Sequence, residues 1–228
     1  MAPVKVQFNN VSLSFGGVTA LHQIDLSLSE PRIAVIGDNG SGKSTLARLV
    51  NGLLLPDEGH VTVDGLDTRT EAPEVRRRVG FLFQNPDNQI IMPTVSEDVA
   101  FGLKNKRISS EEVADRVDEV LKRFNLFSLR NRSAHLLSGG EKQLLALAGV
   151  MVMSPALLVL DEPTTLLDRR NARIVTQMIL DLDVNIILVT HHVELLEEFE
   201  RVIVLEDGRV VCDGPCADTV AFYMENCT

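Results

Sequence analysis

Residues 37–44, with the sequence GDNGSGKS, have the types and spacing of a loop that binds phosphate. Glycines let the backbone turn tightly, so successive N–H groups can point at phosphate oxygens at the positive end of the following helix. The Lys43 ammonium is placed for the β- and γ-phosphates of ATP, and the Ser44 hydroxyl for Mg²⁺. The pattern predicts a nucleotide site formed by Gly37, Asn39, Gly40, Ser41, Gly42, Lys43, Ser44 and Thr45.

Two carboxylates, Asp161 and Glu162, follow the apolar run LLVL at 157–160. Ligands of open α/β sheets lie at the carboxyl ends of strands, which is where this pair is expected. Asp161 is predicted to hold Mg²⁺ together with Ser44, and Glu162 to act as the base that polarises the attacking water. Without the phosphate loop, a solvated acidic turn would be the better interpretation.

Two further polar residues follow apolar runs in the same way. Gln84 comes after VGFLF at 79–83, and His191 comes after NIILVT at 185–190. An amide can contact Mg²⁺ or water, and an imidazole can form a hydrogen bond with a γ-phosphate oxygen. Each alone would be an ordinary surface or core residue. Their positions make both candidates for catalysis, and Gln84 a third candidate ligand of Mg²⁺.

A second glycine pair lies in LSGGEKQ at 137–143, directly before an apolar run with helical spacing. Ser138, Gly139 and Gly140 would offer a hydroxyl and bare N–H groups at a helix N-terminus, which favours anions. The first loop already surrounds one side of the phosphates. The simplest arrangement is therefore two copies head to tail, each offering this segment to the nucleotide of the other. A helix cap with no further role is the alternative.

Two patterns of apolar residues, alternating and continuous, predict strands around these motifs. Period-two alternation at 4–15 and 20–28 predicts strands, and the apolar run RIAVIG at 32–37 predicts a strand buried on both faces. Asp207-Gly208, between two β-rich runs, predicts a hairpin.

Helical spacing appears in the middle and last thirds of the chain. It predicts helices at 109–126, where Ser109 and Glu112 have capping-box spacing, and at 144–153, 169–182 and 193–199. Apolar strands that alternate with helices indicate a three-layer α/β core.

Composition limits the partners. The chain has 228 residues and a net charge of −10, from 22 basic and 32 acidic residues. Nucleic acid is disfavoured as a partner, because proteins that neutralise its phosphates present a basic face. No signal-peptide pattern is visible, and the most apolar stretch, 144–160, is too short and interrupted to span a membrane. The cysteines, Cys212, Cys216 and Cys227, are expected to be free thiols.

GDNGSGKST, Gln84, LSGGE, LLVLDEP and VTH, in this order, resemble the ATPase subunits of ATP-binding cassette (ABC) transporters. The resemblance covers essentially the whole chain. It implies an α/β fold: a P-loop NTPase core with a mostly parallel sheet, an N-terminal antiparallel β-subdomain and a helical subdomain. The expected organisation is one ATPase domain over 1–228, with the core at 1–84 and 155–228 and the helical subdomain, including LSGG, at 85–154.

The resemblance also implies roles for single residues. Glu162 would be the catalytic carboxylate, His191 the switch histidine, and Asp168 the aspartate after the second motif. Phe15 would stack on adenine. Ser138 and Gly140 would meet the γ-phosphate held by the other protomer of an ATP-sandwich dimer.

A narrower similarity lies in FQNPDNQIIMPTVSEDVAFGLKN at 83–105, which resembles the energy-coupling factor branch of the family. This branch drives uptake of vitamins and transition-metal ions, and the segment around Gln84 faces a groove for helices of a membrane protein. The implied partners are a T-type coupling protein, a substrate-binding S-type protein and a second ATPase, identical or related. The implied location is peripheral, on the cytoplasmic face of the membrane.

The compact chain is most similar to biotin-uptake ATPases, followed by those of cobalt or nickel systems. The alternative function is a soluble ABC-type ATPase, such as an iron–sulfur assembly component or a regulatory module. A P-loop kinase or GTPase is disfavoured because the LSGGE motif would have no function in either. His192 departs from the family pattern, since it stands where an aspartate is frequent, but it removes no phosphate, metal or water ligand.

Overall fold

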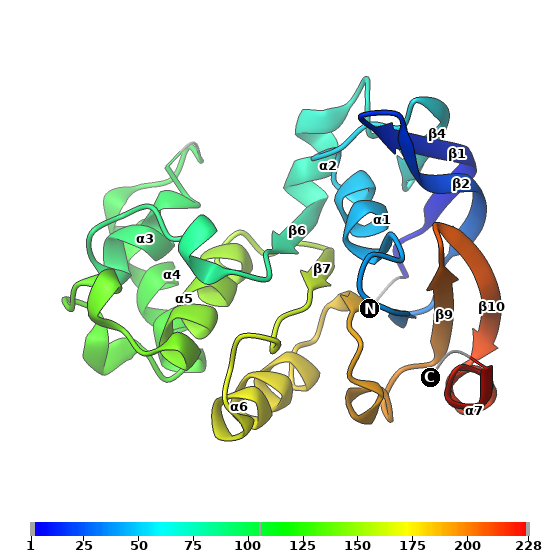
Figure 1. The fold of residues 1–228 in the computed structure, drawn as a ribbon. Helices are drawn as coiled ribbons and strands as arrows, with labels where there is room; N and C mark the ends of the chain where they lie inside the picture. The colour runs from blue at the N-terminus through cyan, green and yellow to red at the C-terminus, as the bar shows by residue number, and fades with distance from the viewer. Residues whose placement is uncertain (1–2, 105, 227–228) are drawn as a thin grey trace. The chain divides into compact units, whose positions relative to one another are not determined.

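The computed structural model describes residues 3–104 and 106–226. These residues form two compact units. The sheet unit takes its described residues from Met1–Phe81, Ala156–Glu162 and Asp183–Thr228. The helical unit takes its described residues from Leu82–Pro155 and Pro163–Leu182. Figure 1 labels most of their helices and strands.

The sheet unit contains a four-stranded antiparallel sheet in the order β2-β1-β4-β5. Its strands are β1 (Val6–Phe15), β2 (Val18–Leu28), β4 (Glu58–Val63) and β5 (Leu66–Asp67). Alternate residues of β1 and β2 are buried, as their period-two pattern predicts. Gly16 and Gly17, both with positive φ, join β1 to β2 as a two-residue hairpin turn.

A six-stranded, mostly parallel sheet has the order β10-β9-β3-β8-β7-β6. Strand β3 pairs in parallel with β8 and β9, and β7 pairs in parallel with β8. Strands β9 and β10 form the predicted antiparallel hairpin at Asp207-Gly208. The strands are β3 (Arg32–Ile36), β6 (Val79–Leu82), β7 (Leu157–Asp161), β8 (Asn185–Val189), β9 (Arg201–Glu206) and β10 (Arg209–Pro215).

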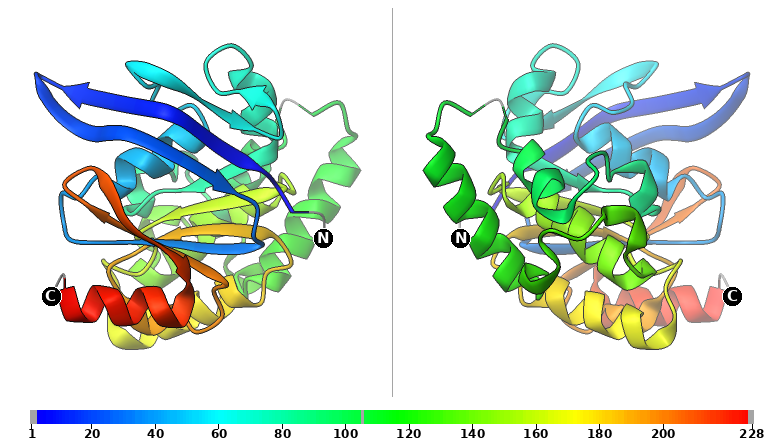
Figure 2. Two further views of the ribbon diagram at one scale, coloured as in Figure 1. Left: turned by 90° about the vertical axis from the view of Figure 1, so that its right-hand side faces the viewer. Right: turned by 90° about the vertical axis from the view of Figure 1, so that its left-hand side faces the viewer.

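Three helices belong to the sheet unit. Helix α1 (Lys43–Val50) packs against β7 and β8 of one sheet and β2 and β4 of the other. Helix α2 (Ala72–Arg78) precedes β6. Helix α7 (Cys216–Asn226), which the sequence analysis did not predict, packs on β9 and β10; Figure 2 shows it in red beside that orange hairpin.

The predicted helix at 193–199 is wrong, because only Val193–Leu195 forms a single 3₁₀ turn. The backbone N–H groups of Leu196 and Phe199 each bond to the carbonyl three residues earlier. Both side chains are buried, and a three-residue spacing suits 3₁₀ geometry.

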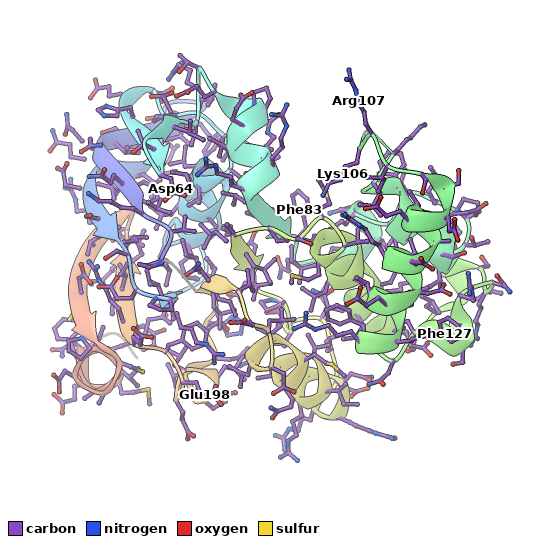
Figure 3. All side chains as sticks on the ribbon, turned by 180° about the vertical axis from the view of Figure 1, so that it is seen from behind. Asp64, Phe83, Lys106, Arg107, Phe127 and Glu198 are labelled. Atoms are coloured by element: carbon purple, nitrogen blue, oxygen red, sulfur yellow. The ribbon has the colours of Figure 1, made fainter. Side chains whose placement is uncertain are left out.

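The helical unit is built around α5 (Gly139–Met151), which contacts α3 (Val95–Phe101), α4 (Ser110–Arg123) and α6 (Arg169–Leu180). The Ser109 hydroxyl caps α4 by accepting from the Glu112 N–H at 3.1 Å, which is one of the two bonds of the predicted capping box. The Glu112 carboxylate accepts from the Arg116 guanidinium at 2.7 Å. After α4, the ring of Phe127, labelled in Figure 3, has two cations near it, with Lys122 Nζ at 5.0 Å and Arg130 Cζ at 5.2 Å from its centroid. Short 3₁₀ turns complete the unit at Pro86–Asn88, Phe127–Leu129 and Ala134–Leu136.

Two sequence expectations concern the chain as a whole. Among the described residues, every helix is too short or too polar to cross a membrane. Cys212 and Cys216 are free thiols, as expected, and Cys227 lies outside the described residues.

Candidate functional site

The phosphate loop connects β3 to α1 and is held by close backbone packing. Gly37, Gly40 and Gly42 have φ values of 145°, 88° and 100°, which are open to glycine. A Cβ atom on Gly37 would overlap the Leu205 carbonyl oxygen, and one on Gly42 would lie 2.7 Å from the Ala20 carbonyl oxygen. Glycine is therefore required at both positions by conformation and by space.

Lys43 is buried at the start of α1, and its ammonium group donates to the carbonyl oxygens of Gly37 and Asp38, each at 2.7 Å. Burial lowers the pKa of Lys43, while the charges of Glu162, Asp38 and Asp161 oppose that shift. The ammonium thus lies directly over the loop it is predicted to serve.

The Ser41 hydroxyl in this loop is buried and has no hydrogen-bond partner among the residues that the structure describes. Buried polar groups are normally paired, so an unpaired hydroxyl beside a buried ammonium is a reason to expect an anion here. These donors, with the N–H groups at the start of α1, fit a polyphosphate.

Asp161 ends β7 with its side chain buried between two partners. The Ser44 hydroxyl donates to Oδ1 at 2.6 Å, and the Arg48 guanidinium lies 3.3 Å from Oδ2. Burial raises the pKa of Asp161, and the Ser44 and Arg48 contacts oppose that rise. Ser44 and Asp161, predicted to share Mg²⁺, are brought together across 117 residues of sequence. A hydroxyl and a carboxylate are oxygen donors that fit Mg²⁺, which also takes substrate phosphates.

Glu162 has a left-handed backbone, with φ of 50°, and its N–H donates to the Val189 carbonyl oxygen at 2.9 Å. Its buried carboxylate has both oxygens 2.9 Å from His191 Nδ1. A non-glycine residue held in this region costs about 1–3 kcal/mol, and such strain clusters at functional sites. The predicted base and the predicted switch histidine are in direct contact.

His192 supports this pair. Its ring lies 4.1 Å from that of His191, centroid to centroid, at an interplanar angle of 36°. Its Nδ1 is 3.2 Å from Glu194 Oε1. The residue that departs from the family pattern therefore packs against the predicted switch histidine.

Phe15 ends β1 immediately before the Gly16-Gly17 turn and is 49% exposed. An aromatic ring of that exposure can receive a flat partner. Its neighbouring strand β2 carries Ala20, whose carbonyl oxygen closely approaches the Gly42 position. The structure therefore places the hairpin of Phe15 beside the phosphate loop.

Ser138 is the N-cap of α5 in the helical unit and is engaged in a complete capping box with Glu141. Its hydroxyl and its N–H both donate to Glu141 Oε2 at 2.7 Å, and the Glu141 N–H donates back to the hydroxyl at 3.3 Å. The backbone and hydroxyl donors of Ser138 lower the pKa of Glu141. The Ser-x-x-Glu spacing could have predicted this box, and the sequence analysis missed it.

Gly140 leaves space for a neighbouring side chain. A Cβ atom there would lie 2.6 Å from Asn171 Oδ1. Asn171 is in turn fixed by Asp168, the N-cap of α6, through two bonds of 2.9 Å, from its N–H to Oδ1 and from its Nδ2 to Oδ2. Asn171, which no sequence pattern indicated, thus joins Asp168 to the second glycine pair.

The predicted site residues divide between the two units. The sheet unit brings together the phosphate loop, Asp161, Glu162 and His191. The helical unit carries Gln84, exposed in the loop after β6, together with Ser138, Gly139, Gly140 and Asp168. Arg48 is a further site residue that the sequence analysis missed. Its position one helical turn after Ser44 is the signal that could have indicated it.

Comparison with known proteins gives consistent results. Residues 21–165 match the family described as ABC transporter. The biotin transport ATP-binding protein BioM of Rhizobium etli is 47% identical over 97% of this chain and 99% of its own length. The energy-coupling factor transporter ATP-binding protein EcfA1 of Clostridium novyi is 43% identical over 86% of this chain and 72% of its own. The structure of cbiO1 from Clostridium perfringens, part of the ABC transporter complex cbiONQ, has 33% identity and a TM-score of 0.84, covering 96% of this chain and 91% of that one.

Proposed function

The chain belongs to the ABC transporter family of ATPases, and we propose that two copies of it close on ATP to drive an importer of the energy-coupling factor type. ATP binding and ATP hydrolysis coupled to transport follow from that membership. The contact between Glu162 and His191, in the unit that carries the phosphate loop, is the observation that carries the catalytic proposal.

The phosphate loop binds the triphosphate of ATP in this proposal. Its N–H groups and the Ser41 hydroxyl donate to phosphate oxygens, and the Lys43 ammonium leaves the loop carbonyls to contact the β- and γ-phosphates. The exposed ring of Phe15 stacks on adenine.

Ser44 and Asp161 hold Mg²⁺, and the amide of Gln84 is the third candidate ligand. Bound Mg²⁺ would supply positive charge at the β- and γ-phosphate oxygens. The Ser44 hydroxyl donates to Asp161 Oδ1 at 2.6 Å, so the chain itself brings these two candidate ligands together.

Glu162 positions and activates the attacking water. The left-handed backbone of Glu162 holds its carboxylate just after the end of the buried strand β7. His191 orients this carboxylate through Nδ1. The remaining ring nitrogen of His191 is then free to act toward the γ-phosphate. The His192 ring packs against that of His191 at a tilted angle.

The second nucleotide contact comes from the partner copy. Ser138 and Gly140 of one protomer meet the γ-phosphate held by the other. Asp168, linked to the Gly140 position through Asn171, is a further candidate residue of the nucleotide site. Large apolar side chains are exposed close to both segments, with Leu136 68% and Leu166 60% exposed. A partner copy that closes on these segments would cover both side chains.

Biotin is the proposed solute, supported by the similarity to BioM along nearly the full length of both chains. The proposed partners are a T-type coupling protein and a substrate-binding S-type protein in the membrane, which would place this chain at its cytoplasmic face. The membrane partner would dock on the segment around Gln84, which continues to the exposed side chains of Ile91 and Phe101.

Glu162→Gln tests the catalytic proposal, because it removes the base and keeps the shape of the side chain. Hydrolysis should fall by at least about 100-fold, while the variant accumulates as an ATP-bound dimer in light scattering after size exclusion. Unchanged hydrolysis would contradict the role of Glu162, and a strictly monomeric ATP-bound variant would contradict the dimer.

Coexpression with candidate T-type and S-type proteins tests the transport proposal. The chain should be retained on a detergent-solubilised, tagged membrane protein, and labelled biotin should enter cells in a manner that Lys43→Ala abolishes. Retention on a soluble partner alone would favour a function unrelated to transport.

A further inference from the structure

The C-terminal helix reaches the phosphate loop through a pocket in the sheet unit. The pocket has a volume of about 190 Å³ and is lined by residues 38–41 of the loop, residues 205–207 at the end of β9, and Tyr223 of α7. None of the residues predicted to act on the nucleotide lies in α7. The pocket therefore connects the nucleotide site to an element with no assigned role.

Tyr223 makes the direct contact. Its ring is only 5% exposed, and its hydroxyl donates to Asp38 Oδ1 at 3.1 Å, across 185 residues of sequence. The Asp38 carbonyl oxygen accepts from the Lys43 ammonium at 2.7 Å. Asp38 is thus bound through its backbone by the catalytic lysine and through its carboxylate by the C-terminal helix.

The surrounding backbone makes this contact rigid. The Gly208 N–H donates to the Ser41 carbonyl oxygen at 3.0 Å, which ties the β9–β10 turn to the loop. Helix α7 packs on β9 and β10, so the turn and Tyr223 approach the loop from the same supporting hairpin. A shift of α7 would therefore displace the Tyr223 hydroxyl and weaken its hydrogen bond to Asp38.

The charge of Asp38 gives the contact a functional consequence. A carboxylate one residue after Gly37 lies close to where the triphosphate binds, and the two negative charges repel each other. A carboxylate fixed by a hydroxyl donor cannot turn toward the phosphates, whereas a released one can. The hydrogen bond also lowers the effective charge that the nucleotide meets.

We propose that Tyr223 is a positioning residue for ATP: by holding the Asp38 carboxylate on the side of α7, it makes the affinity for ATP depend on the docking of the C-terminal helix. This inference rests on the assignment of the loop to the ATP phosphates, and its test reads nucleotide affinity rather than hydrolysis or transport. Tyr223 itself does not touch the reacting atoms.

A double-mutant cycle tests the proposal, with every protein in the Glu162→Gln background so that ATP persists. Tyr223→Phe keeps the ring and removes the hydroxyl, and should weaken MgATP binding in calorimetry by about threefold to tenfold. In the presence of Asp38→Asn, which has no charge to restrain, the same Tyr223→Phe change should alter the dissociation constant less than about twofold. Equal weakening in both backgrounds, or none in either, would overturn the proposal.

A matched control separates positioning from folding. Cys216→Ala removes another hydrogen bond of α7, from Sγ to the Leu196 carbonyl oxygen at 3.2 Å, at the end of the helix away from Asp38. It should leave MgATP affinity within about twofold of the parent, even where it lowers the unfolding midpoint. A Tyr223→Phe protein that melts earlier but binds MgATP like its parent would show a purely structural contact and overturn the proposal.

Tyrosine fluorescence supplies an independent test of the Tyr223–Asp38 hydrogen bond. Tyr223 is its one tyrosine and it has no tryptophan, so near-ultraviolet emission arises from Tyr223. A carboxylate that accepts from a phenol quenches its emission, so Asp38→Asn should brighten the nucleotide-free protein. Unchanged emission would mean that the Tyr223–Asp38 bond is absent in solution, which also overturns the proposal.

Discussion

Replacing Arg48 by Met should make the protein less stable without nucleotide and should tighten its binding of MgATP. The Arg48 guanidinium lies beside the buried Asp161 carboxylate, at 3.3 Å from Oδ2. Met has a similar length and helix propensity, so the substitution mainly removes the charge. Mg²⁺ would later supply that charge at the same carboxylate.

The expected magnitude lies between two limits. Removing one partner of a fully buried ion pair costs about 3–5 kcal/mol, and an exposed pair contributes about 0–1 kcal/mol. The Asp161 side chain is 1% exposed but that of Arg48 is 41% exposed, so solvent screens the pair in part. We therefore expect a loss of about 1–2 kcal/mol, a decrease of about 2–8 °C in the unfolding midpoint.

Thermodynamic linkage determines the expected change in MgATP affinity. If Mg²⁺ replaces Arg48 at Asp161, the loss of stability disappears in saturating MgATP, and MgATP affinity rises by the same free energy, about 5-fold to 30-fold. Thermal unfolding and calorimetry in the Glu162→Gln background measure both quantities. ATP with a chelator in place of Mg²⁺ should leave the variant destabilised.

Arg77→Met is the matched control, since it makes the same change in an exposed pair. Arg77 lies 3.4 Å from Glu74, with side chains 72% and 48% exposed. It should cost less than about 0.5 kcal/mol, with or without MgATP. The reasoning is refuted if Arg48→Met destabilises the free and the MgATP-bound protein equally, because Arg48 and the metal then do not compete for Asp161.

Three other predictions concern single contacts. The hydrogen bonds of Ser138 lower the pKa of Glu141. The stabilisation that they give is therefore fully present above the ordinary glutamate pKa of about 4.3 and is lost as the pH falls through the lower folded pKa. Glu141→Gln should remove this part of the pH dependence of urea unfolding, and an unchanged profile would contradict the prediction. Glu162→Gly relieves the strain of the left-handed backbone, so the free energy of unfolding should stay the same or rise by up to about 1 kcal/mol, while hydrolysis stops. A decrease of more than about 1 kcal/mol in the free energy of unfolding, measured by urea titration, would be inconsistent with strain at this position. Gly140→Ala should cost about 1–3 kcal/mol in the same titration because its Cβ meets Asn171, and Asn171→Ala should restore most of it; a fully stable single variant would exclude that contact.

Residue pairs at the carboxyl edge of the parallel sheet could be placed from the sequence. Glu162 and His191 meet because each follows a strand that ends at this edge. Ser44 meets Asp161 because the phosphate loop, which follows β3, brings the start of α1 to the same edge. The Asp207-Gly208 hairpin was equally predictable, since its turn residues have a local preference.

Contacts without a local pattern could not be predicted. Tyr223 reaches Asp38 across most of the chain, and Asn171 fills the space beside Gly140, through packing that no periodicity records. The predicted helix at 193–199 failed for a related reason, because two buried side chains three residues apart also fit a 3₁₀ turn.

Mixing two inactive variants tests the central claim, that Ser138 of one copy meets the ATP held by the phosphate loop of the other. Lys43→Ala disables the loop, and Ser138→Phe disables the second contact, so each protein alone should hydrolyse almost no ATP. In a mixed dimer, one site combines the intact loop of one copy with the intact Ser138 of the other. The mixture should regain up to about a quarter of the wild-type rate, since about half of the dimers are mixed and each has one intact site. A mixture as inactive as its two components would contradict it.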